Sequence, residues 1–312
     1  LEDIRTSFAE SRMLRDIMTL LAPFKLTPKT ALKIYQHFGP ACLDLLRKSP
    51  FELCQIPGFG FRRVDAIVRK TDNRPRDPMR IRGALHCTLD EAKGKQGHLF
   101  LEKEDLCKAA FKLLNEKIPL PEMRVRPEEV ERELDGMILS GLVVSMRDNI
   151  YHPAAFAQED ETASRIARLL AEEKPPMRDI SALIDAVRAE QGLKTSGKQE
   201  SAVRTAFLYN LSVITGSPGT GKTTVLKMIL EVYCRLYPDN KIVLMAPTGR
   251  ASRRMAESTG FDGACTLHSG LGLVSEEDEG SRSRKKDGLD ADLVIVDEFS
   301  MVDMWLAGKF FP

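Results

Sequence analysis

The stretch ITGSPGTGKTTVLK, residues 214–227, decides the fold of the C-terminal part of this chain. From Gly216 to Thr223 it fits G-x-x-x-x-G-K-[ST] at every position, and the apolar run LSVIT (211–215) precedes it. The pattern predicts a strand, a phosphate-binding loop and a helix. Glycines let backbone N–H groups converge on phosphate oxygens at a helix N-terminus. A chance glycine-rich turn, the alternative reading, would not explain the flanking strand and helix.

The expected ligand of this loop is ATP with Mg²⁺. Lys222 would reach the β and γ phosphates as a catalytic residue, and the Thr223 hydroxyl would bind Mg²⁺. A guanine nucleotide is disfavoured because the sequence has no N-K-x-D motif. The predicted nucleotide-binding residues of the loop are Gly216, Ser217, Pro218, Gly219, Thr220, Gly221, Lys222, Thr223 and Thr224.

The segment DLVIVDEFS supplies an acidic pair at the end of a second apolar run. Residues 293–296 predict a buried strand, which would deliver Asp297 and Glu298 to the edge where ligands bind in open α/β sheets. We expect Asp297 to hold Mg²⁺, and Glu298 to act as the general base on the attacking water. Such a pair is a weak signal alone, but it lies about 75 residues after a phosphate loop.

Composition permits cores and restricts the class of protein. The chain has 312 residues, of which 43% are hydrophobic, and its net charge is +1, so any nucleic-acid surface must be local. Six scattered cysteines form no CxxC, which argues against a zinc ribbon and suits reduced thiols in a cytoplasmic protein. The sequence shows no signal peptide, and its longest apolar stretch is too short to span a membrane.

The order of patterns predicts an α/β fold combined with α-helical domains. Residues 1–80 are expected to form short helices, such as the one with Thr27 as its cap and Pro28 in its first turn. Two helices and two short β-rich runs around residues 147–149 make residues 81–156 winged-helix-like, with a generic α+β spacer as the alternative. Residues 157–198 would be a helical connector. Residues 199–312 would form a P-loop lobe with a parallel sheet.

Three segments resemble motifs of superfamily 1 DNA helicases: APTGRASRRMAE resembles motif Ia, ACTLHSGLGL the Thr-x-His element, and DEFSMVD motif II. The best match is the RecD-like family, related to the exonuclease V alpha subunit. The resemblance implies a RecA-like lobe and a glutamine, here Gln199, that reads the adenine edge. It also implies backbone contacts to single-stranded DNA from Thr248, Gly249 and Arg250, and more weakly from Thr266 and His268. For Gln199 and His268, a surface side chain and a helix-cap side chain are the alternatives.

The N-terminal half shares this resemblance. IPGFGFRRVDAIV resembles a helix-hairpin-helix, a DNA-binding element without sequence preference, with Pro57, Gly58, Phe59 and Gly60 as its hairpin. LTPKTALKIYQHFG resembles a second, degenerate copy. Residues 25–80 contain twelve Lys or Arg and five Asp or Glu, an excess that suits phosphate contacts. The alternative is that both hairpins serve only as packing units.

The resemblance implies an ATP-dependent DNA helicase acting in DNA repair and recombination, and the chain departs from it in two places. Residues 275–288 are polar where related helicases place a hairpin, so we expect a mobile loop there. The second RecA-like lobe, with its arginine finger, does not follow motif II. We therefore expect a truncated or internal fragment that binds nucleotide without unwinding DNA. An AAA+ type remodeller and a DNA-binding module with a regulatory ATP site are the alternatives, and the sequence names no protein partner.

Overall fold

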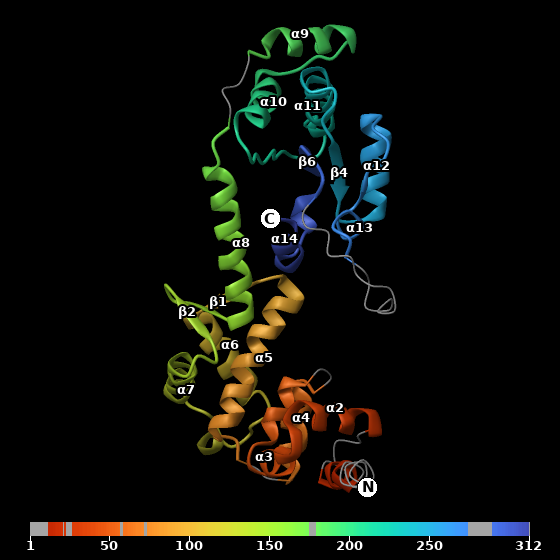
Figure 1. Ribbon diagram of the computed structural model, residues 1–312. Helices are drawn as coiled ribbons and strands as arrows, with labels where there is room; N and C mark the ends of the chain where they lie inside the picture. The colour runs from red at the N-terminus through yellow and green to blue at the C-terminus, as the bar shows by residue number, and fades with distance from the viewer. Residues whose placement is uncertain are drawn as a thin grey trace, which may run out of the picture. The chain divides into compact units, whose positions relative to one another are not determined.

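The computed structural model describes residues 12–20, 22, 27–56, 59–71, 74–174, 179–273 and 289–311 (Figure 1). The chain divides into two compact units, residues 1–156 and residues 157–312, and each has its own hydrophobic core. The expectations for Pro57, Gly58 and the loop at 275–288 lie outside the described residues. Within the described part, no helix is both long and apolar enough to cross a membrane.

The first unit begins with short helices, as the sequence predicts. After helical residues 12–20 come α2 (Pro28–Phe38), η2 (Gly39–Ala41), α3 (Cys42–Lys48), η3 (Pro50–Gln55) and α4 (Phe61–Thr71). Thr27 caps α2 by accepting a hydrogen bond from the Thr30 N–H at 3.3 Å. The helix ends at Gly39, whose φ of +67° suits glycine.

The second half of this unit has the order of a winged helix. Its elements are α5 (Pro78–Gln96), β1 (Phe100–Glu102), α6 (Lys103–Asn115), η4 (Pro121–Met123), α7 (Pro127–Leu139), β2 (Val144–Met146) and β3 (Asn149–Tyr151). The strands form an antiparallel sheet in the order β1-β3-β2. Arg147 and Asp148 both have positive φ, as a two-residue hairpin turn requires. The two short β-rich runs expected around residues 147–149 therefore form a hairpin, and the winged-helix-like assignment of residues 81–156 stays a prediction.

A single core joins the helical hairpins to the winged-helix-like part. Phe51, Phe61 and Leu85 belong to the same buried cluster as Leu134 and Ile150. The boundary that the sequence suggests after residue 80 falls inside α5. At that point Arg80 is 1% exposed, and its Nε donates to Asp65 Oδ1 at 2.5 Å. The guanidinium also donates to the carbonyls of Pro75 and Leu114, so a buried charge ties α4, α5 and α6 together.

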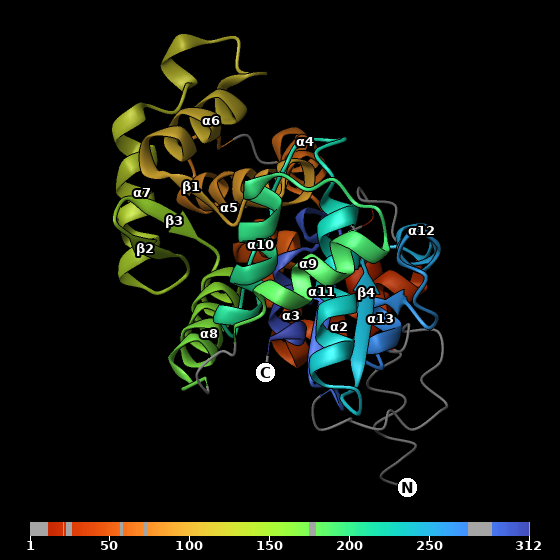
Figure 2. The same ribbon diagram turned by 90° about the horizontal axis from the view of Figure 1, so that it is seen from above.

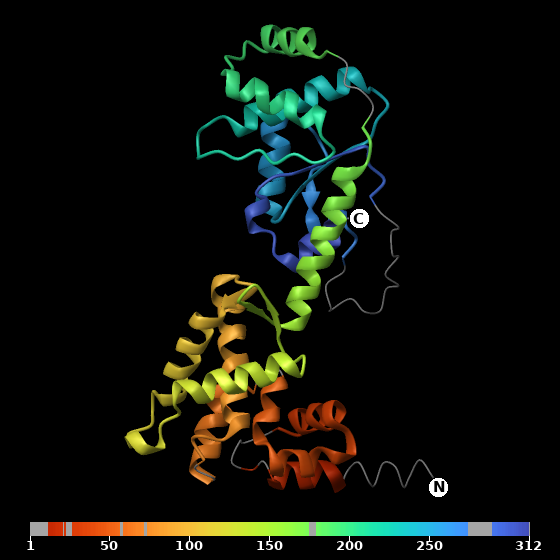
Figure 3. The same ribbon diagram turned by 90° about the vertical axis from the view of Figure 1, so that its left-hand side faces the viewer.

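The second unit carries the parallel sheet. Its elements are α8 (Pro153–Ala171), which begins in the first unit, α9 (Ser181–Glu190), α10 (Gly197–Leu208), α11 (Lys222–Leu236), β4 (Ile242–Ala246), α12 (Gly249–Thr259), β5 (Cys265–Thr266), α13 (Leu267–Gly270), β6 (Leu293–Val296), η6 (Phe299–Met301) and α14 (Met304–Phe310). Figure 3 shows α8 as one unbroken helix. The strand order is β5-β4-β6, and Ile242 pairs with Leu293. The helices α11 and α12 pack against each other. Figure 2 shows both of them beside β4.

Two expectations about this sheet are wrong. The run LSVIT (211–215) forms no strand, because none of the described strands pairs with it, and Val213 is 80% exposed. Ile214 and Val296 line a common hollow. The strand β6 is present but only partly buried, because its residues, Leu293 to Val296, line that hollow.

The buried ion pair predicts a large effect of a single substitution. Asp65→Ala leaves the Arg80 guanidinium without its carboxylate, so we expect the free energy of unfolding to fall by about 3–5 kcal/mol. Denaturant titration followed by circular dichroism measures it. Arg47→Ala is the control, since its pair with Asp44 is 3.8 Å long and exposed, and should change little. A loss below about 1 kcal/mol for Asp65→Ala would contradict this interpretation.

His86 predicts a pH dependence of stability. Its ring stacks on His152 with centroids 5.3 Å apart, and burial lowers its pKa from 6.5 to about 4. Because the unfolded state binds this proton more readily, stability falls as pH drops from 6.5 to 4, by about 1.4 kcal/mol per unit. His86→Phe should remove that part of the slope in denaturant titrations over this range, whereas His37→Gln, at an exposed position, should keep it. Identical slopes in wild type and His86→Phe would refute the assignment.

Candidate nucleotide and DNA site

The phosphate loop has the backbone that its glycines predict. Gly219 and Gly221 have φ of +79° and +83°, which side chains with a Cβ adopt at a cost. A Cβ on Gly216 would lie 2.6 Å from the Thr220 hydroxyl oxygen, so no larger residue fits there without a shift. Helix α11 begins at Lys222, directly after Gly221. A tight, glycine-dependent loop therefore leads directly into the N-terminus of α11, and this combination favours the binding of an anion.

The side chain of Lys222 lies over this loop. Its Nζ donates to the Gly216 carbonyl at 2.5 Å and is 3.4 Å from the Ser217 carbonyl. The Thr220 hydroxyl also donates to Ser217, at 2.8 Å. Lys222 and Thr223 are both exposed, so the ammonium and the hydroxyl are accessible to a ligand. A phosphate bound at the loop would accept the hydrogen bonds that the ammonium donates here to the two carbonyls.

The acidic pair lies directly after β6. The Asp297 N–H donates to the Met245 carbonyl at 3.0 Å. This hydrogen bond continues the pairing with β4 and fixes the backbone position from which the Asp297 side chain extends. Asp297 Oδ1 in turn accepts the Glu298 N–H at 2.9 Å. Glu298 has φ of +53°, an uncommon conformation for a residue with a side chain. Such strained residues persist where surrounding structure holds them, and they gather at functional sites.

A hollow of about 990 Å³ brings these segments together; we call it the central hollow. Its lining includes Lys222 and Thr223 from the loop, and Asp297 and Glu298 from the end of β6. Arg250, at the start of α12, lines it as well. Residues separated by up to 76 positions in sequence thus share one cavity, as expected at the carboxyl ends of parallel strands. Of the loop residues, Pro218, Gly219 and Gly221 also line the central hollow.

The oxygen ligands in the central hollow suit Mg²⁺. Mg²⁺ prefers hard oxygen ligands and usually keeps several waters, so one hydroxyl and one carboxylate are a sufficient protein contribution. Thr223 and Asp297 offer those two groups. No cluster of three or more His, Cys, Asp or Glu that could hold a metal occurs among the described residues.

Gln199 contacts the loop from α10. It closes a capping box with Ser196, and its Nε2 donates to the Thr220 carbonyl at 3.0 Å. A Cβ on Gly221 would lie 2.4 Å from that nitrogen, so the glutamine packs against the loop backbone. The side chain is therefore held beside the nucleotide loop, and its contact to adenine stays a prediction.

The residues expected to contact single-stranded DNA gather beyond β4 and β5. Thr248 caps α12 by accepting the Ala251 N–H at 3.2 Å, and Gly249 opens that helix. Thr266 caps α13 and approaches the position of a Cβ on Gly249 at 4.0 Å. His268, in α13, lies 6.5 Å from the Trp305 ring, centroid to centroid. The contacts of these residues with DNA remain predictions.

Arg254 is a residue that sequence reasoning missed. It lies one helical turn after Arg250 on α12, is exposed, and lines the central hollow too. The sequence indicated this residue through its spacing of four from Arg250, because residues four apart lie on the same face of a helix.

The N-terminal hairpin is only partly available for DNA. The Phe59 ring is 1% exposed, and its N–H donates to the Ile56 carbonyl at 3.0 Å. Gly60 accepts the N–H groups of Arg63 and Val64 at the start of α4. The N–H of Phe59 is thus already bonded within the chain, whereas Gly60 lies at an exposed position.

Many basic side chains of this region are engaged internally. Arg62 pairs with Glu91 and Glu116, and Arg76 pairs with Glu129 at 2.7 Å. These carboxylates all lie outside residues 25–80, so a count within that stretch overstates the free positive charge. The lysines Lys29, Lys33 and Lys48 are exposed and form no ion pair with any described carboxylate.

Each unit contains a stretch that matches a known domain family. Residues 10–100 match the helix-hairpin-helix domain of ATP-dependent RecD2 DNA helicases, and residues 199–312 match an AAA domain. The chain is 30% identical to the ATP-dependent RecD2 DNA helicase of Deinococcus radiodurans over 95% of its own length and 41% of that protein. It is 38% identical to the RecBCD enzyme subunit RecD of Haemophilus influenzae over 36% of its length and 20% of that subunit.

A third relative is the RecBCD enzyme subunit RecD of Buchnera aphidicola subsp. Schizaphis graminum, 27% identical over 68% of this chain and 39% of that subunit. The chain thus spans less than half the length of these curated relatives. These matches confirm the RecD-like resemblance drawn from the sequence.

The strained backbone at Glu298 predicts that a glycine at this position stabilises the fold. Glu298→Gly relaxes the positive φ, so we expect the free energy of unfolding to rise by up to about 1 kcal/mol. Glu298→Gln keeps the strain and should leave stability unchanged. Thermal unfolding of the two variants distinguishes them, and a Glu298→Gly protein less stable than Glu298→Gln would show that the conformation is not strained.

Proposed function

We propose that this RecD-like chain, in which a RecD2-type helix-hairpin-helix domain precedes an AAA domain, forms part of an ATP-dependent DNA helicase. It would bind ATP with Mg²⁺ in the central hollow and single-stranded DNA beside it, and couple hydrolysis to movement along the strand. The observation that carries the proposal is the convergence of Lys222, Thr223, Asp297 and Glu298 on one cavity. Reduced thiols agree with action in the cytoplasm, since all six cysteines are free.

Each residue has a distinct role in the proposed reaction. The Lys222 ammonium exchanges the Gly216 carbonyl for β and γ phosphate oxygens, where a charge-assisted hydrogen bond is stronger. Thr223 and Asp297 would hold Mg²⁺, which supplies positive charge to the same phosphates when bound. Glu298 accepts the proton of the attacking water. Its strained backbone, fixed by the hydrogen bond to Asp297, sets the direction of that carboxylate.

The proposed DNA contacts come from two separate places. In the second unit, Thr248, Gly249 and Arg250 lie where α12 begins, and Arg250 supplies a guanidinium for phosphates. In the first unit, the exposed lysines of α2 and α3 supply positive charge near the hairpins. Contacts of this kind read the phosphate backbone and are therefore independent of sequence.

Removing the ammonium tests the nucleotide site. Lys222→Ala should weaken ATP–Mg²⁺ binding by about tenfold or more, because a charge-assisted phosphate contact is lost. Titration calorimetry measures it. The control is Lys227→Ala, also on α11 but outside the lining of the central hollow, which should bind as wild type does. Equal affinities for wild type and Lys222→Ala would remove the basis of the proposal.

Reversing the charge of α2 tests the first DNA surface. Lys29 and Lys33 are one turn apart, and a double Lys→Glu variant should weaken binding to single-stranded DNA. The slope of log affinity against log salt should fall by roughly 1.4, at about 0.7 per lost phosphate contact. Fluorescence titrations of the full chain measure both. Lys93→Glu, at an exposed position of α5, is the control, and an unchanged slope in the α2 variant would leave the hairpins as packing units.

A further inference from the structure

The helix that faces DNA in related folds has an unsuitable charge here. In helix-turn-helix proteins the second helix of the pair enters the major groove. In this chain α7 holds that place, after α6 and before the β2–β3 hairpin. Its exposed residues include Glu128, Glu131 and Asp135, with Arg132 as the single exposed base. Phosphate backbones are repelled by such a face, since DNA binding depends on neutralising phosphates with Lys and Arg.

The carboxylates of α7 divide into two groups by position. Glu129 and Glu133 point inward and pair with Arg76 and Arg82, at 2.7 and 2.8 Å. These two have a structural role in holding α7 against the preceding helices. Glu131 lies beyond the first turn of α7 and forms no ion pair with a described residue, although it interacts electrostatically with Lys103, whose own ion pair is with Asp135.

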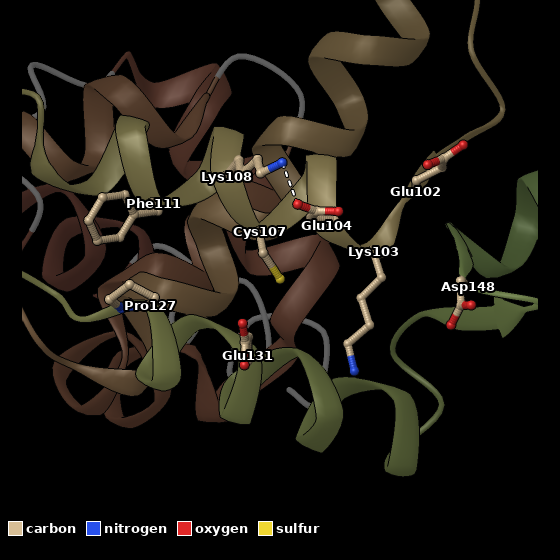
Figure 4. A pocket seen from close by; sticks show the side chains of 9 residues that line it. All are labelled: Glu102, Lys103, Glu104, Cys107, Lys108, Phe111, Pro127, Glu131 and Asp148. Atoms are coloured by element: carbon tan, nitrogen blue, oxygen red, sulfur yellow. Dashed lines mark ion pairs between the residues drawn. The ribbon is translucent and has the colours of Figure 1, made fainter.

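A groove of about 650 Å³ opens between α6, α7 and the hairpin (Figure 4). Its lining consists of Glu102, Lys103, Glu104, Cys107, Lys108, Phe111, Pro127, Glu131 and Asp148. Figure 4 shows Phe111 and Pro127 at one end, where they form an apolar floor together with Cys107. Burial raises the pKa of the Cys107 thiol, so the floor stays uncharged at neutral pH.

The charge balance of the groove is negative. Its two lysines are already neutralised, because Lys103 pairs with Asp135 at 2.7 Å and Lys108 with Glu104 at 2.5 Å. Glu102, Glu131 and Asp148 form no ion pair with a described residue, although Lys103 also interacts with Glu131 electrostatically. The groove therefore carries an excess of carboxylates around an apolar floor.

Large apolar side chains are also exposed at the far end of α7 and in the residues that follow it. Leu139 shares a face of α7 with Glu131 and Asp135, at spacings of four, and is 88% exposed. Leu142 and Met146, which follow it toward the hairpin, are 44% and 46% exposed. Large apolar side chains grouped on a surface mark interaction sites more often than single ones do.

We propose that the α6–α7 groove and this face of α7 form a docking site for another protein, through a segment that alternates basic and apolar side chains. The basic groups would meet Glu102, Glu131 and Asp148, while apolar groups would occupy the floor at Phe111 and the surface at Leu139. Charge complementarity selects this occupant over nucleic acid, and it sets the register and the rate of association more than the affinity. The winged-helix-like part is then a protein-recruiting module rather than a second DNA reader.

Fluorescence anisotropy on the full chain tests the proposal with defined probes. The probe is a short fluorescein-labelled peptide of Lys and Leu, and the reference peptides replace Leu by Ser or Lys by Glu. The double variant Glu131→Gln, Asp148→Asn should weaken binding of the Lys–Leu peptide about tenfold. The matched control is Glu122→Gln, Asp160→Asn, which removes the same two charges at exposed positions outside the groove and should bind as wild type does.

A second variant separates apolar docking from general charge attraction. Leu139→Ser changes a side chain that supports no core, so it should fold normally and still weaken the Lys–Leu peptide, with little effect on the Lys–Ser peptide. Equal weakening by the groove and control pairs would overturn the proposal. It would also be overturned if labelled duplex DNA displaced the peptide and Arg132→Ala abolished that DNA binding, because α7 would then be a DNA reader.

Discussion

The parallel pairing of β4 with β6 is the constraint on which the nucleotide site depends. The register sets Met245 beside Val296, and one further hydrogen bond, from Asp297 to Met245, places the acidic pair beside the start of α12. Because both strands run in the same direction, the residues that follow them emerge at one edge of the sheet. Thr248 and Asp297 therefore face a common cavity, although the intervening chain is long.

Electrostatic pairing organises the first unit differently. Arg80 brings a charge into the core and is compensated by Asp65 and two carbonyls. Around it, Arg62, Arg76 and Arg82 reach across to carboxylates of later helices. A buried pair of this kind contributes little net stability over an apolar replacement, but it penalises any arrangement in which one partner is missing. The basic residues of the hairpins thus fix the position of the winged-helix-like part, and only some remain for DNA.

The two kinds of surface in this chain have opposite charge. Lysines of α2 and α3, and the arginines of α12, offer positive groups without carboxylate partners among the described residues, whereas the exposed face of α7 offers carboxylates. The positive surface favours phosphate binding, and the negative face of α7 favours protein docking. A near-neutral net charge of +1 conceals this division.

The sequence by itself determined those features whose physical cause is local. The phosphate loop and the start of α11 follow from glycine conformations within a few residues, and the cap at Thr27 and the turn at Arg147 are equally local. The strands β4 and β6 were recognisable because each is a continuous apolar run. The family resemblance could also be drawn from the sequence, because each of its motifs is a short continuous stretch.

Only the tertiary structure decided what depends on distant partners. LSVIT has the composition of a strand, yet a strand needs a neighbour to complete its hydrogen bonds, and no described strand provides one. The apparent basic excess of residues 25–80 was reduced by carboxylates at 91, 116 and 129, which no local count includes. Likewise, Gln199 meets Thr220, and Arg254 enters the central hollow, only because separate helices pack beside the loop. Hydrogen-bond ladders and ion pairs join residues far apart in sequence, and their partners become known when the chain is folded.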